Sequence, residues 1–80
     1  MKITAKVVYK DETHRRLERE LEQMLGTLQR FMNRGDRVTA VYVHTKIMGI
    51  AWAMYMANCF SIARFYYIEN RANKVMGWQY

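Results

Sequence analysis

The chain is poor in the residues that cross-link or interrupt a fold. Its 80 residues include no proline, four glycines and one cysteine, Cys59. A single cysteine excludes a disulfide within the chain, and its mostly apolar neighbours predict a buried, unreactive thiol. With only two histidines besides, and no suitable spacing, no metal site is expected. The absence of linker-like or low-complexity stretches indicates a single compact domain over residues 1–80.

The sequence also lacks the residue groupings that catalysis requires. His14 and His44 are not placed with a nucleophile and an orienting carboxylate. Neither "MGI" nor "MGW" forms a glycine-rich phosphate loop. We therefore predict that the protein is not an enzyme and uses no cofactor. One alternative stays open, a ribonuclease built on the two histidines and a lysine.

The N-terminal segment "MKITAKVVYK" has no long apolar stretch of the kind found in signal peptides, which predicts a cytoplasmic protein. Apolar residues and lysines alternate along it, as in a strand with one solvent-exposed face. Asp11 or Thr13 then offers an N-cap for a helix, and Gly35 a left-handed C-terminal residue. Between them, helical spacing connects Leu17, Leu21, Met24, Leu25, Leu28, Phe31 and Met32.

The remainder of the chain predicts a mixed fold. Residues 37–45, "RVTAVYVHT", are β-branched and apolar on both faces, which favours an inner strand and a β-α-β unit. Residues 46–58 favour an apolar helix. Residues 60–69 and the final "KVMGWQY" favour a C-terminal β-hairpin turning at "NRAN". The predicted fold class is therefore α+β, and the alternative is one long helix from Lys46 to Met76.

An uncharged run of 17 residues, Ile47 to Ala63, stands out in a chain of net charge +6. Small residues at Gly49, Ala53 and Ala57 would form a ridge on the helix predicted there, where another backbone can approach. The hydrophobic core of an 80-residue chain is only just large enough to stabilise a fold. We therefore predict a homodimer with this ridge at the interface. A single membrane span is a further alternative, since such spans need about 17–25 apolar residues.

The positive charge is concentrated on one side of the predicted leucine-rich helix. Its arginines fall within an arc of about 100°, opposite the apolar stripe, and glutamates lie at the edges of the arc. A solvated surface with local Arg–Glu pairs explains this pattern as well as a phosphate-binding face does. The arginines concerned are Arg15, Arg16, Arg19, Arg30 and Arg34.

Further cations accompany this arc at both ends of the chain. Lys6 and Lys10 lie on the outer face of the predicted first strand. In "RFYYIENRANKVMGWQY", Arg64, Arg71 and Lys74 alternate with aromatic residues. Single-stranded nucleic acid is commonly held by such a mixture, because cations bind phosphates while aromatic rings stack on bases. Trp78 and Tyr80 are the aromatics expected to be most exposed.

Together these patterns predict a small basic protein that binds nucleic acid, RNA more than DNA, through an arginine-rich helix face. The alternative is a protein-interaction module or inhibitor that docks on an acidic partner. Small size, absence of proline and abundant methionine and tyrosine are also typical of phage accessory or counter-defence proteins, although no motif adds to this compositional likeness.

Overall fold

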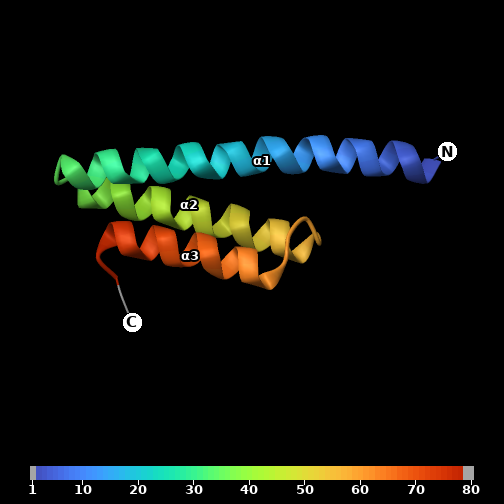
Figure 1. Ribbon diagram of the computed structural model, residues 1–80. Coiled ribbons are helices and arrows are strands. Elements are labelled where there is room, and N and C mark those ends of the chain that lie inside the picture. The colour runs from blue at the N-terminus through green and yellow to red at the C-terminus, as the bar shows by residue number, and fades with distance from the viewer. Residues whose placement is uncertain (1, 79–80) are drawn as a thin grey trace.

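The computed structural model describes the backbone of residues 2–78 and the side chains of residues 12–78. It consists of three helices, α1 (Lys2–Asn33), α2 (Arg37–Met56) and α3 (Ile62–Met76). α2 runs antiparallel to α1 and α3, and the N-terminal part of α1 extends past both (Figure 1). Residues 2–78 contain no strand. The predicted α+β class is therefore wrong, and the fold is all-α.

The predicted first strand, residues 2–10, is the beginning of α1. Its lysines at positions 2, 6 and 10 are four residues apart, a spacing that suits one face of a helix as well as one face of a strand. No glycine or proline separates this segment from the leucine-rich helix that follows. Because nothing ends the helix there, α1 continues through both segments and no β-α-β unit forms.

The predicted inner strand, residues 37–45, is the first half of α2. Asp36 caps this helix, and its side chain accepts a hydrogen bond from the Thr39 backbone N–H at 3.2 Å. Ala40, Val43 and Ile47 are buried at helical spacing. β-branched residues lower helix propensity by only about 0.5 kcal/mol each, so the cap and this burial outweigh them.

The predicted C-terminal hairpin is the helix α3. The Ser61 side chain caps it by accepting a hydrogen bond from the Arg64 backbone N–H at 3.2 Å. The alternative of one long helix from Lys46 to Met76 is also wrong, because residues 57–61 interrupt it. Burial at spacings of three and four shows why the aromatic-rich segment folds as a helix, and the buried residues are Phe65, Ile68, Ala72 and Met76.

All three helices end in a Schellman motif, with one residue of positive φ after the last turn. Gly35 has φ +77°, which confirms its prediction as a left-handed helix terminator, and Gly77 has the same value. Asn58, at φ +60°, takes this role after α2. The closing hydrogen bonds run from the backbone N–H of Asp36, Cys59 and Trp78 to the carbonyls of Phe31, Met54 and Asn73, at 3.0, 2.8 and 2.8 Å.

We expect Asn58→Ala to lower the free energy of unfolding by about 1 kcal/mol, because an alanine Cβ is unfavourable in the left-handed region. Asn58→Gly should leave it unchanged or raise it, since glycine adopts this conformation freely. Urea denaturation followed by circular dichroism measures both. An equal loss in the two variants would contradict the conformational explanation and assign the effect to the asparagine side chain.

The core lies between the three helices, and the leucine stripe predicted for α1 is confirmed as part of it. Leu21, Leu25 and Leu28 of α1 are buried, with Leu17 partly buried beside them. No helix among the described residues is long and apolar enough to cross a membrane. The other buried residues come from α2 and α3: Ala40, Val43, Ile47, Ala51, Met54, Phe65, Ile68, Ala72 and Met76.

Candidate nucleic-acid interface

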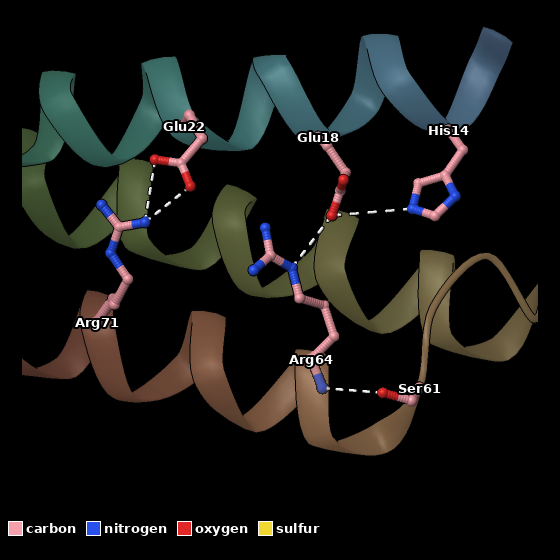
Figure 2. A network of polar contacts seen from close by, with 6 residues as sticks. All are labelled: His14, Glu18, Glu22, Ser61, Arg64 and Arg71. Carbon is pink, nitrogen blue, oxygen red and sulfur yellow. Dashed lines mark hydrogen bonds and ion pairs between the residues drawn. The ribbon is translucent and has the colours of Figure 1, made fainter. Parts of the chain in front are cut away.

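Two ion pairs connect α1 to α3 on one side of the bundle (Figure 2). The Arg64 Nε donates to the Glu18 carboxylate at 3.1 Å. The Arg71 Nη1 donates to both oxygens of Glu22, at 2.7 and 3.0 Å. Each side chain is partly exposed, so we expect each pair to contribute no more than about 1 kcal/mol to stability. Their main effect is to position the two guanidinium groups of α3.

The charge on Arg71 is reinforced by its partner. The hydrogen bond that Arg71 donates to the Glu22 carboxylate is the largest influence and raises the pKa of the Arg71 guanidinium, against a smaller lowering by burial. When folding raises the pKa of a cation, the protonated group stabilises the folded state at every pH below the pKa that the group has in the unfolded chain. For an arginine, this stabilisation is lost only in strongly alkaline solution. Arg71 is therefore a cation throughout the physiological pH range.

The two arginines of α3 also gather around one tyrosine. The Arg64 guanidinium lies 4.9 Å from the centre of the Tyr67 ring, and that of Arg71 lies 5.6 Å from it. Tyr67 is 47% exposed. Such cation–π contacts contribute about 0.5–1 kcal/mol each at exposed sites. The structure thus places an accessible aromatic ring between two predicted nucleic-acid-binding cations.

The arginines of α1 adjoin this cluster. Arg15 and Arg19 line a groove of about 280 Å³ together with Glu18, Glu22 and Arg64. Arg71 and Lys74 line a second hollow of about 450 Å³, next to Gln29 of α1 and Val75. We call the two together the α1–α3 face. Its charged residues are five cations (Arg15, Arg19, Arg64, Arg71 and Lys74) and two carboxylates (Glu18 and Glu22).

Three other arginines predicted to bind nucleic acid, Arg16, Arg30 and Arg34, do not line this face. Arg16 is exposed. The Arg30 Nη2 donates to the Thr27 hydroxyl at 3.0 Å, and the Arg34 guanidinium lies 5.9 Å from the centre of the Phe31 ring. The side chains of Lys6 and Lys10 lie outside the described residues. The structure therefore brings together half of the predicted cations, namely those that line the two hollows.

Sequence reasoning missed the role of Glu18 and Glu22, which it paired with neighbouring arginines of their own helix. The two acids are four residues apart, and Arg64 and Arg71 are seven apart, so each set shares one face of its helix. The predicted strand over residues 60–69 does not show this signal, because a spacing of seven residues returns to the same face in a helix but not in a strand. Tyr67 was missed for the same reason, because a strand would separate it from the face that carries Arg64.

Of the two aromatic residues predicted to be exposed, the structure describes Trp78. Trp78 is 40% exposed and packs edge-on against His44, with ring centres 4.8 Å apart. The His44 Nε2 lies 2.8 Å from the Asn73 side-chain oxygen. Tyr80 lies outside the described residues. His14 instead adjoins Phe60, before the start of α3, so the two histidines lie at opposite ends of that helix and share no site.

The three small residues predicted to form an oligomer ridge, Gly49, Ala53 and Ala57, are all exposed. Gly49 is exposed on the side of α2 that faces away from the core. Ala53 and Ala57 also border an apolar groove of about 350 Å³ between α1 and α2, which the partly buried Cys59 lines too. The homodimer predicted through this ridge stays a prediction.

The α1–α3 face is chemically suited to binding an anion. Guanidinium and ammonium groups donate hydrogen bonds to phosphate or carboxylate oxygens. The residues that line the face include no serine, cysteine or histidine that could act as a nucleophile or base. The chain matches no protein-family model, no curated protein and no solved structure.

Proposed function

We propose that the protein binds nucleic acid, with RNA preferred over DNA, and that the α1–α3 face is the binding surface. The observation that carries this proposal is the surplus of cations on the face, whose two carboxylates are both engaged in ion pairs with arginines. Phosphate contacts supply most of the affinity of proteins that bind nucleic acid without reading its sequence.

The cations form one row on α1 and another on α3, and the two rows suit the extended sugar–phosphate backbone of a single strand. Arg15 and Arg19 are one turn apart, about 6 Å along α1. Arg64 to Lys74 extend over about 15 Å of α3, which runs in the same direction. A strand of nucleic acid lying along the face would meet cations from both helices at several successive phosphates.

The ion pairs leave donors available for such contacts. A guanidinium carries five N–H groups. Arg64 uses its Nε and Arg71 uses its Nη1 for the carboxylates, so the remaining groups of each arginine can donate to phosphate oxygens. Their side chains are already ordered by the carboxylates and by Tyr67, which lowers the entropy lost on binding.

A preference for RNA rests on Tyr67. Its ring is half-exposed beside two cations, and unpaired bases stack on such rings while cations bind the flanking phosphates. Sequence-specific recognition of RNA targets unpaired bases most often, whereas a duplex offers none to stack. The expected ligand is therefore a single-stranded segment or loop.

The test removes the three cations of the α1–α3 face that form no ion pair with a carboxylate among residues 12–78. In the triple variant Arg15→Gln, Arg19→Gln, Lys74→Gln, we expect affinity for a single-stranded RNA to fall about 10–100-fold near 0.1 M salt. The slope of log affinity against log salt should become shallower by about 0.7 for each lost phosphate contact. Fluorescence anisotropy with labelled RNA, measured across a salt series, gives both quantities.

A single pair of variants provides the matched control. Arg37→Gln removes the same charge as Arg19→Gln, but Arg37 is exposed at the start of α2 and does not line the α1–α3 face. Arg19→Gln should weaken binding more than Arg37→Gln. Equal binding by the triple variant and the wild type would contradict the proposal. So would failure of the wild type to bind RNA or DNA at low salt, which would favour an acidic protein partner.

A further inference from the structure

α2 carries a second apolar stripe, on the side away from the core. Successive members of the stripe are separated by four and three residues in turn. This is the pattern of the a and d positions that form the seam of a coiled coil. Four of them are large and exposed: Val38 by 84%, Tyr42 and Met56 by 62% and Trp52 by 50%. We call this set the outer stripe, and its members are Val38, Tyr42, Thr45, Gly49, Trp52 and Met56.

The outer stripe lies opposite the buried side of the same helix. In the heptad that these positions define, the f positions, opposite the seam, are Ala40, Ile47 and Met54, and all three are buried against α1 and α3. The outer stripe contains no charged residue. Lys46 flanks it, with its ammonium 5.3 Å from the centre of the Tyr42 ring.

A helix that is apolar on two opposite sides is normally covered on both. The outer stripe presents on the order of 500 Å² of surface, so a pair of such stripes would bury about 1,000 Å². This area is near the lower limit for a specific protein–protein interface and exceeds most accidental contacts. It is enough for a reversible dimer.

We infer that the outer stripe binds the same stripe of a second copy, with the two α2 helices antiparallel. Side-chain sizes along the stripe are symmetric about its middle. In an antiparallel pair centred there, Thr45 meets Gly49 of the second copy, and Tyr42 meets Trp52. Val38 meets Met56 at the two ends, so small residues lie at the centre and large residues flank them on both sides.

This symmetry is the reason to choose a second copy over an unrelated partner. A twofold interface must be complementary to itself, and the outer stripe satisfies this condition at each of the three residue pairs named above. The glycine at its centre lets the two helices approach closely. Lys46 would lie near its own copy in such a pair, so this dimer should hold or strengthen as salt rises, because salt screens like-charge repulsion.

The dimer would leave the nucleic-acid face uncovered. The buried residues of α2 point toward α1 and α3, and the outer stripe faces the opposite way, although the ring of Trp52 also packs edge-on against Phe65 of α3, with ring centres 5.5 Å apart. Each copy would therefore present its own α1–α3 face to solvent. The inference does not depend on the proposed function, and each can fail without the other.

The test adds one positive charge at the centre of the stripe. A Cβ at Gly49 would meet nothing within 4 Å, so Gly49→Lys fits the single chain and improves helix propensity. Gly26→Lys on α1 is the matched control, because that glycine is equally unobstructed and mid-helical but lies on another helix. Sedimentation velocity should show a dimer for the wild type and for Gly26→Lys. Gly49→Lys should weaken association about 100-fold or more while keeping its helical circular dichroism.

Several results would overturn the inference. These are a monomeric wild type up to about 1 mM, a Gly49→Lys variant that associates like the wild type, or a dimer that weakens steeply with salt. The orientation has its own test in a Cys59→Ser background. Mixed chains carrying Thr45→Cys and Gly49→Cys should oxidise mainly to the 45–49 pair. Predominant 45–45 cross-links would indicate parallel helices and contradict the antiparallel pairing.

Discussion

Replacing Leu28 with alanine is expected to lower the free energy of unfolding by about 2–5 kcal/mol. Leu28 is among the largest fully buried side chains, at 0% exposure, and belongs to the core shared by all three helices. Alanine would leave a cavity that the rigid helix backbone cannot close. A domain of this size has a total stability of only about 4–12 kcal/mol, so this single change would bring it close to unfolding.

The measurement is urea denaturation of the wild type and the variant at equal protein concentration, followed by circular dichroism. Leu17→Ala is the graded control, because Leu17 lies on the same stripe of α1 but is only partly buried. It should lose clearly less stability than Leu28→Ala. Equal losses at the two positions would contradict the difference in burial between Leu17 and Leu28.

Replacing Asn70 with proline is expected to cost about 3 kcal/mol or more, because Asn70 lies in the middle of α3. Proline there removes the backbone hydrogen bond to the carbonyl of Tyr66 and places its ring against that carbonyl. The buried residues Ile68 and Ala72 flank the position, so a kink would displace them from the core. We expect a variant with little helical circular dichroism or a greatly lowered melting temperature.

Asn70→Ala provides the comparison. Asn70 is exposed, and alanine has the higher helix propensity, so this variant should match the wild type or gain about 0.5 kcal/mol. The same pair of variants separates the helix from a hairpin. In a hairpin, Asn70 would be the first residue of the turn "NRAN", where proline would remove no helical hydrogen bond and should cost less than in the middle of a helix. A proline variant as stable as the wild type would contradict α3.

The leucine-rich helix was predictable from sequence because its signals agree with one another. Leucines at helical spacing, a charged opposite side and Gly35 at the end all indicate the same element. The arginines of α1 were predictable as a group for the same reason. Their periodicity is a property of one helix and needs no knowledge of its neighbours.

The remaining elements were not predictable in this way because local propensity and tertiary burial disagree there. Residues 37–45 and 60–69 are rich in β-branched and aromatic side chains, which favour strands. Each segment nevertheless begins with a capping residue, Asp36 or Ser61, and buries a helical stripe. These caps are visible in the sequence, but a single hydrogen-bonding side chain is a weak signal beside a run of aromatic residues.

By itself, the sequence therefore determined the leucine-rich part of the first helix, its termination at Gly35 and the clustering of arginines on one side of it, because these depend on contacts a few residues apart. Only the tertiary structure decided that Glu18 and Glu22 bind Arg64 and Arg71, more than forty positions away. It also decided which of the two apolar sides of α2 enters the core. That choice depends on the packing of α1 and α3, since a helix that is apolar on both sides carries no local preference for either.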